Sequence, residues 1–403
     1  MTISSYINSI LYSYNSFFRL LLRTYFKTRN TPARLTPKRF FFMSAFMPAL
    51  FFMNTVHWIG FLLDEILFPG YRNVEVKAPL FIVGIPRSGT SYTHRLISRD
   101  IDRFTTLTLW ELLLAPSISE RKLWLLLSRL EKALGRPVLR IVEMITGKTT
   151  SRLDAIHKIR LCDPEEDYFL LIPLFACYLL ILPFPFKDIM GHLAFFDEAT
   201  PPETKKMIMT FYASCLKRHL YVQGEGKTVL SKNVAFSPMV SALTETFPDC
   251  KILCNIRNPL ETIPSHISSM LSGGDIFFND MGYEFRNQMI DLQRYAFSHL
   301  TDFLPTLPDS RHAFLIMEDL KNDVHYEIAH IYDRFGYKIT DTFESLLIAE
   351  KNKERNYSSR HTYSLASFGL TAGDIRARFA DVFAGFTFDK EKEWPQQDRA
   401  ERV

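Results

Sequence analysis

A glycine-bounded loop, Gly84-Ile85-Pro86-Arg87-Ser88-Gly89-Thr90-Ser91, contains the residue types that bind an anion. It follows a short apolar run at 80–83, and a helical pattern begins near Thr90. The first amides of a helix have no intrahelical acceptor, and the helix dipole adds positive potential at the same place. Arg87 can grip an oxyanion with two parallel hydrogen bonds. The loop therefore predicts a phosphate-type binding site.

The residue types of this loop, in contrast to its spacing, argue against the usual ATP-binding chemistry. ATP-binding loops read Gly-x-x-x-x-Gly-Lys-Ser/Thr, and their lysine contacts the β- and γ-phosphates while the hydroxyl binds magnesium. Here the distance from Gly84 to Gly89 is kept, but Thr90 occupies the lysine position and the cation is Arg87. A P-loop kinase is therefore the disfavoured alternative.

Two further polar motifs follow apolar runs of the buried-strand type. Arg257-Asn258-Pro259 comes after the run 251–256, and Ser265 lies eight residues beyond Arg257 on a predicted helix. An arginine at a strand end and a hydroxyl on the next helix suit a second, dianionic phosphate. Lys232, in Leu230-Ser231-Lys232-Asn233, ends another short strand.

On these motifs the sequence resembles the sulfotransferases, most closely the branch of bacterial and tyrosylprotein enzymes with a Pro-Arg-Ser-Gly-Thr loop. The resemblance covers about residues 79–385. It implies the donor 3′-phosphoadenosine-5′-phosphosulfate, with the 5′-phosphate and sulfate held by Arg87, Ser88, Gly89, Thr90 and Ser91. The same resemblance assigns the donor's 3′-phosphate to Arg257 and Ser265.

The resemblance also suggests the catalytic groups. It places Lys232 at the bridging oxygen of the departing sulfate, with Arg87 stabilising the sulfuryl oxygens, and it implies Glu111 as the base. A carboxylate beside Trp110 could have its pKa raised toward a useful range. Alternatives for the base are His94, which also fits a core histidine, and Glu165 or Glu166. A contact of Arg360 or His361 with the nucleotide is a further suggestion, and Met317 to Leu320 fit a scaffold role.

The elements that must position these residues indicate an α/β fold. Four short apolar runs, at 80–83, 228–230, 251–256 and 313–316, alternate with helical segments such as 238–247 and 259–271. This alternation predicts a three-layer, P-loop-like fold with a central parallel sheet. Ligands of such sheets bind at the carboxyl ends of the strands, where the motifs fall.

The N-terminal region has a different composition. Residues 1–39 carry seven basic and no acidic side chains, and residues 40–63 carry no formal charge. An uncharged segment of this length fits a spanning helix, a helix in the membrane interface, or a buried helix covering the catalytic domain. We expect a membrane-associated helical region at 1–70, a sulfotransferase domain at 71–390 and a polar tail at 391–403.

The composition argues against some classes of partner and cofactor. A net charge of +4 does not suggest nucleic acid. The five cysteines have neither disulfide-framework nor zinc spacing, and we expect no metal because cationic side chains and amides can neutralise the sulfate. The apolar stretch 168–186, with three prolines, fits either a pocket lining or core.

The resemblance and these features together predict a sulfotransferase acting on a hydroxyl of a hydrophobic or lipid-like acceptor. We expect its catalytic domain in the cytoplasm if residues 40–63 lie on a membrane; a spanning segment would instead place that domain on the far side. A non-catalytic, membrane-attached scaffold is the alternative from a different class.

Overall fold

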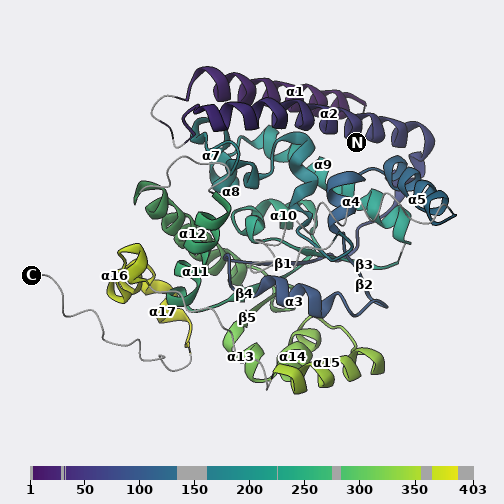
Figure 1. Ribbon diagram of the computed structural model, residues 1–403. Coiled ribbons are helices and arrows are strands. Elements are labelled where there is room, and N and C mark those ends of the chain that lie inside the picture. The colour runs from purple at the N-terminus through teal and green to yellow at the C-terminus, as the bar shows by residue number, and fades with distance from the viewer. Residues whose placement is uncertain are drawn as a thin grey trace, which may run out of the picture.

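A five-stranded sheet lies at the centre of the computed structural model (Figure 1). The structure describes residues 3–28, 31, 33–133, 161–224, 226–274, 283–354 and 365–388. All neighbouring strands pair in parallel, in the order β2-β3-β1-β4-β5. The strands are β1 (Leu80–Gly84), β2 (Phe104–Thr105), β3 (Thr228–Lys232), β4 (Lys251–Ile256) and β5 (His312–Ile316). The predicted parallel α/β fold is confirmed, and the two-residue β2 is an addition.

Each central strand contributes to two hydrophobic cores because its side chains alternate between the faces of the sheet. In β1, Phe81 and Val83 belong to one cluster of buried side chains, whereas Leu80 and Ile82 belong to another. Burial on both faces explains why these strands appear in the sequence as continuous apolar runs.

Helices cover both faces. The Leu80 face packs on α3 (Thr90–Ile97), α13 (Met317–Asn322), α14 (Val324–Arg334) and α15 (Asp341–Glu354). The Phe81 face is covered by α7 (Lys187–Ala194), α8 (Phe196–Ala199), α9 (Pro202–Gln223), α10 (Val240–Thr246), α11 (Pro259–Gly274), α12 (Tyr283–Phe303), α16 (Ala372–Arg378) and α17 (Ala380–Gly385). Two further helices, α4 (Leu109–Leu114) and α5 (Ile118–Ala133), follow β2 in the chain.

An N-terminal pair of helices, α1 (Ile3–Phe26) and α2 (Pro37–Leu67), lies side by side over the Phe81-face helices (Figure 1). Thr36 caps α2 by accepting a hydrogen bond from the amide of Arg39, and Pro37 occupies the first turn, where its missing N–H costs nothing. Phe17 and Met47 belong to the same buried cluster as Phe81. Among the described residues, α2 is the one helix long and apolar enough to cross a bilayer.

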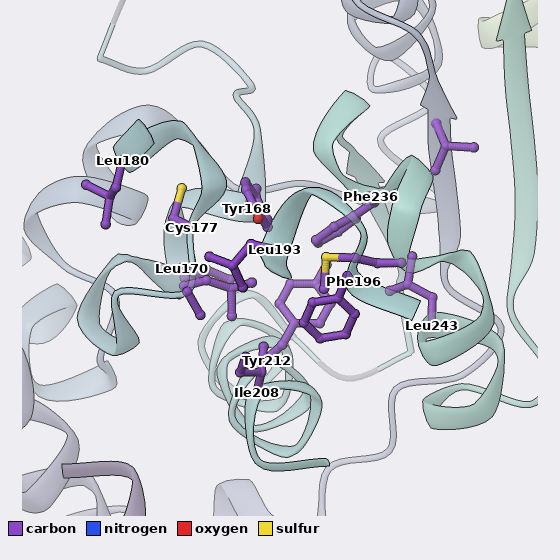
Figure 2. Packing of buried hydrophobic residues seen from close by; sticks show 14 of the residues in the cluster. Tyr168, Leu170, Cys177, Leu180, Leu193, Phe196, Ile208, Tyr212, Phe236 and Leu243 are labelled. Atoms are coloured by element: carbon purple, nitrogen blue, oxygen red, sulfur yellow. The ribbon is translucent and has the colours of Figure 1, made fainter. Parts of the chain in front are cut away.

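The apolar stretch 168–186 forms core. It forms two short 3₁₀ turns, η2 (Asp167–Leu174) and η3 (Tyr178–Ile181), and η2 ends at Phe175, which has a positive φ of 54°. Figure 2 shows Tyr168 and Leu170 of η2 packed among side chains from α8, α9 and α10. Ser13 of α1 donates a hydrogen bond to the Pro173 carbonyl at 2.6 Å, so this stretch is held under the N-terminal helices. The stretch therefore fills space between the layers, and none of its residues lines the small pocket beside Lys232.

Four of the five cysteines are buried, and Cys162 is exposed. Residues 391–403, Arg360 and His361 lie outside the described residues.

Candidate functional site

The loop after β1 is a tight turn with three residues of positive φ. Gly84, Arg87 and Gly89 have φ values of 142°, 72° and 91°. A Cβ on Gly84 would lie 2.5 Å from the carbonyl oxygen of Asn255, and one on Gly89 would collide with the Met317 side chain. Both glycines are therefore required by the backbone, because L side chains avoid this region and neighbouring atoms occupy the space. Gly89 caps α3, so the turn delivers the chain to a helix N-terminus.

The serines of this region divide into structural and accessible groups. Ser88 is fully buried and donates to the carbonyl of Ile85 at 2.8 Å, which closes the turn. Ser237, from η4 (Val234–Met239), donates to the Gly84 carbonyl and accepts from its amide. Ser91, by contrast, is half-buried and lines a pocket. The Ser88 hydroxyl thus shapes the cradle, while Ser91 is available to a ligand.

The two predicted phosphate motifs meet in space. Arg87 donates from Nε to the Ser265 hydroxyl at 2.9 Å, although 178 residues separate them. Arg257 donates from Nη1 to the Arg87 carbonyl at 3.2 Å. This convergence follows from the sheet, since β1 and β4 are parallel neighbours and both motifs follow their carboxyl ends. Two arginines from separate strands therefore lie in one site.

Acidic side chains flank the second arginine. Arg257 pairs with Glu261, one turn along α11, and lies 4.0 Å from Glu318. Burial and the charge of Glu261 raise the pKa of Glu318. These carboxylates balance the arginine charge within the protein.

A small pocket lies next to the turn, between the start of α3 and the segment 163–165. It is lined by Ser91, His94, Arg95, Asp163, Pro164, Glu165 and Lys232. Lys232 reaches it from the carboxyl end of β3, directly beside β1. Its side chain is only 3% exposed, and its Nζ donates to Glu166 at 2.6 Å. The pocket therefore joins the anion loop to a cation and two adjacent glutamates.

A buried carboxylate, Asp167, fixes this wall to the sheet. Ser231 and Asn233, on either side of Lys232, donate to its Oδ1 at 2.8 and 2.7 Å. Tyr212 of α9 donates to its Oδ2 at 2.5 Å. Since Glu166 and Asp167 are consecutive, and so are Ser231, Lys232 and Asn233, the two segments are held in one register. Asp167 thereby positions Glu166 opposite Lys232.

The candidate bases have distinct surroundings. Glu111 is 2% exposed and forms the capping box of α4, accepting from Thr108, while its other oxygen accepts from Gln223 and lies 3.3 Å from Arg121. Burial raises its pKa, but Arg121 and the Thr108 bonds outweigh burial, so its pKa lies below the usual value. Protein groups therefore contact both carboxylate oxygens of Glu111, and Glu111 is not among the residues that line this small pocket.

Glu165 differs from Glu111 both in its position relative to the pocket and in the direction of its pKa shift. It lines the pocket, and burial raises its pKa against the opposing charge of Lys232. His94 also lines the pocket, but its Nε2 bonds Thr106 at 2.8 Å, and burial lowers its pKa to about 3. Of these two side chains, Glu165 has a pKa shifted toward neutral pH and His94 has a pKa shifted away from it, and a base works best near the operating pH.

Sequence reasoning missed Asp163, Arg95 and Asp167. The run Asp163-Pro164-Glu165-Glu166-Asp167 was a usable signal, because four acids directly before an apolar stretch are unusual. Nothing in the sequence, however, pairs that run with the end of β3. Among the described residues, no group of three metal-ligating side chains lies together.

Comparison with known families matches residues 79–341 to the sulfotransferase family. The chain belongs to the sulfotransferase family. The match begins just before β1 and includes the anion loop, Lys232, Arg257 and Ser265. The N-terminal helices α1 and α2 lie outside it.

Two solved sulfotransferases have a similar fold. STF9 from Mycobacterium avium aligns with a TM-score of 0.70 at 17% identity, covering 95% of this chain and 96% of that protein. STF1 from Mycobacterium tuberculosis H37Rv aligns with a TM-score of 0.64 at 18% identity, covering 94% and 99%. No match was found among curated protein sequences. This sulfotransferase therefore shares its fold with distant relatives over nearly its whole length.

The buried Asp167 predicts a specific dependence of stability on pH. Burial raises its pKa from 3.8 to about 6, so the folded protein holds this proton more tightly than the unfolded chain. Its contribution to stability is full below about pH 4 and is lost as the pH rises to about 6. We expect Asp167→Asn to gain on the wild type by up to about 3 kcal/mol between pH 4 and pH 7. Urea unfolding of both proteins across this range checks it, and parallel pH profiles would contradict it.

Proposed function

We propose that this sulfotransferase transfers a sulfuryl group from 3′-phosphoadenosine-5′-phosphosulfate to a hydroxyl of an apolar, lipid-like acceptor. The contact between Arg87 and Ser265 carries the donor assignment, because it joins an anion loop and a second phosphate motif in one site. A donor with phosphate groups at both the 5′ and 3′ positions requires two such clusters. An ATP-dependent kinase requires a lysine where Thr90 stands, so we do not favour it.

Different residues of the site suit the two phosphate-bearing ends of the donor. The turn 84–89 and the first amides of α3 suit the 5′-phosphate and sulfate, with Arg87, Thr90 and Ser91 around them. Arg257 and Ser265 suit the 3′-phosphate, which distinguishes this donor from ADP and ATP. Ser88 and Gly89 keep the turn in shape.

Two charged groups perform the chemistry. As the S–O bond to the donor phosphate breaks and the bond to the acceptor oxygen forms, Lys232 neutralises the charge that grows on the departing oxygen. Glu165 takes the proton of the acceptor hydroxyl, and its raised pKa suits that transfer. Glu166 and Asp167 hold Lys232 in position.

We also propose an apolar acceptor and a membrane-associated enzyme whose catalytic domain lies in the cytoplasm with its nucleotide donor. The support is the large exposed apolar surface of α1, α2 and α5. An enzyme held at a bilayer meets lipid alcohols at high local concentration, whereas soluble sugars gain nothing from this arrangement.

The proposed donor predicts that nucleotide affinity depends on a 3′-phosphate and on Arg257. Calorimetric titration of the purified protein with 3′-phosphoadenosine 5′-phosphate should show binding, and ADP should bind at least about 30-fold more weakly because it lacks the 3′-phosphate, a loss of about 2 kcal/mol. Arg257→Ala should reduce the affinity of the first ligand to that of ADP and leave ADP unchanged. Equal binding of both nucleotides by the wild type would remove the sulfotransfer assignment.

The proposed catalytic roles predict that substitutions of Lys232 and Glu165 lower kcat, whereas a substitution of Glu111 lowers stability. Lys232→Ala should lower kcat by about 10²–10³, the usual cost of losing one stabilising group. Glu165→Gln should lower kcat by about 10²–10⁴ with nucleotide affinity unchanged. Glu111→Gln should chiefly lower the melting temperature, since it disturbs a capping box and a buried ion pair. A kcat lost in Glu111→Gln but kept in Glu165→Gln, with folding intact in both, would return the base to Glu111.

The acceptor class predicts a preference that can be measured directly. With labelled donor, kcat/KM for a long-chain or sterol alcohol in mixed micelles should exceed that for a soluble sugar by at least about 100-fold. Each buried methylene contributes about 0.8 kcal/mol to binding, so a few of them produce this ratio. A faster reaction with the sugar would contradict the apolar acceptor while leaving the donor assignment intact.

A further inference from the structure

The inner face of α2 is fastened to the catalytic domain from one end to the other. Near its start, Arg39 is buried and donates to the Pro183 carbonyl at 2.8 Å. In the middle, Asn54 donates to Ser13 of α1 at 3.0 Å, and Ser13 in turn donates to the Pro173 carbonyl of the domain at 2.6 Å. Toward its end, His57 bonds Glu120 of α5 at 2.7 Å.

Asp64, near the end of α2, forms a buried ion pair with the domain. Its carboxylate accepts from Arg218 at 2.9 Å and from the amides of Ile118 and Ser119. Both charged side chains are almost completely buried. Lifting α2 off the domain to cross a bilayer would leave these charges unpaired, at a cost of several kcal/mol each. In the folded protein α2 therefore lies along the domain and does not span.

The outer face of the same helix carries no exposed charge beyond Lys38. Asp64 is buried and Glu65 turns inward to Arg72 and Arg218. The most exposed side chains are instead large and apolar: Phe41 is 73% exposed and Phe52 71%, and Ile59, Leu63 and Ile66 continue the row. Their spacing places them on one side of a helix that is about 45 Å long. Monomeric soluble proteins rarely expose so long an apolar row.

Neighbouring helices widen this row into a surface. On α1, Ile7, Leu11, Phe18, Leu22 and Phe26 are exposed and share one face. On α5, residues 123–127 and Leu130 are exposed and apolar. Figure 1 shows α1 and α2 side by side across one end of the molecule, with α5 beside the C-terminal part of α2. We call the exposed faces of α1, α2 and α5 the apolar platform.

Positive charge borders the platform at one end. Arg19, Lys27, Arg34 and Lys38 are exposed around the connection between α1 and α2, and residues 1–39 contain no acid. An apolar surface bordered by basic residues is complementary to a bilayer with anionic headgroups, in which the apolar side chains enter the acyl boundary and the cations pair with phosphates. A protein partner would need an acidic groove of matching length, whereas a bilayer adapts to a broad helical surface.

We infer that the apolar platform docks the enzyme flat on an anionic lipid bilayer, without spanning it, with the basic connection at the headgroups. This inference deepens the membrane association of the proposed function, but it does not depend on sulfuryl transfer. It also specifies orientation, because the platform lies on the Phe81 side of the sheet and α13 to α15 then point away from the lipid (Figure 1).

Flotation of the full chain with vesicles tests the inference. The wild type should float with phosphatidylcholine vesicles containing 30% phosphatidylserine and bind several-fold more weakly when 0.5 M salt is present or phosphatidylserine is absent. The double variant Phe41→Glu/Phe52→Glu should lose at least about tenfold in vesicle affinity. Arg19→Glu/Lys27→Glu should lose about fivefold or more, and only with anionic vesicles.

Ile348→Glu supplies the matched control, since Ile348 is an exposed apolar residue of α15 on the other side of the sheet. It should float like the wild type. Titration with 3′-phosphoadenosine 5′-phosphate, and melting temperatures, establish that each variant folds. Failure of the wild type to float, or equal flotation of Phe41→Glu/Phe52→Glu, would overturn the inference. So would a dimer in light scattering that this double variant dissociates, because the platform would then be a protein interface. Failure of nucleotide binding alone would count against the donor assignment and not against docking.

Discussion

Asp167 is the carboxylate on which the geometry of the site depends, because it joins the start of η2 to the carboxyl end of β3. Its three hydrogen bonds come from Ser231, Asn233 and Tyr212. A buried carboxylate with no cation beside it is costly. The same bonds place Glu166 against Lys232 and set Glu165 into the pocket. The hydrogen bonds that stabilise the buried Asp167 therefore also fix the positions of the proposed catalytic groups.

The segment that begins at Asp167 also connects the site to the N-terminal helices. From Asp167 the chain continues into η2, whose carbonyl at Pro173 accepts from Ser13 of α1. The aromatic rings of Phe17 and Phe175 lie 5.8 Å apart in the same region. One continuous stretch thus supports the pocket wall at one end and the apolar platform at the other. A surface that meets lipid and a pocket that performs chemistry are built on a shared core.

The loop after β1 and the two arginines beside it are also held in place by other protein groups. Gly84 and Gly89 allow a turn that other residues could not form, and Ser88 and Ser237 tie that turn to the sheet. Arg87 then bridges to Ser265, and Arg257 contacts the backbone of the same turn. Because each arginine is held by neighbouring groups before any ligand arrives, less conformational entropy remains to be lost on binding.

Local sequence patterns were enough to predict the parallel α/β fold and the tight, glycine-bounded turn before α3. Both depend on local patterns, namely short apolar runs that alternate with helices and two glycines at a fixed spacing before a helix. The convergence of Arg87 with Ser265 also followed, because the carboxyl ends of parallel strands meet at one edge. The two-residue strand β2 did not, since two residues carry no periodicity.

The surroundings of the carboxylates and the position of α2 could not be predicted before the fold was known. Glu111 and Glu165 are both glutamates near apolar residues, and their different pKa values arise from Arg121 in one case and from burial beside the pocket in the other. Likewise, the uncharged residues 40–63 fit a spanning, an interfacial or a buried helix until Asp64 is seen paired with Arg218, 154 residues away. Hydropathy depends on each side chain alone, whereas burial and charge pairing depend on neighbours that are distant in the chain, and for that reason the fold had to supply them.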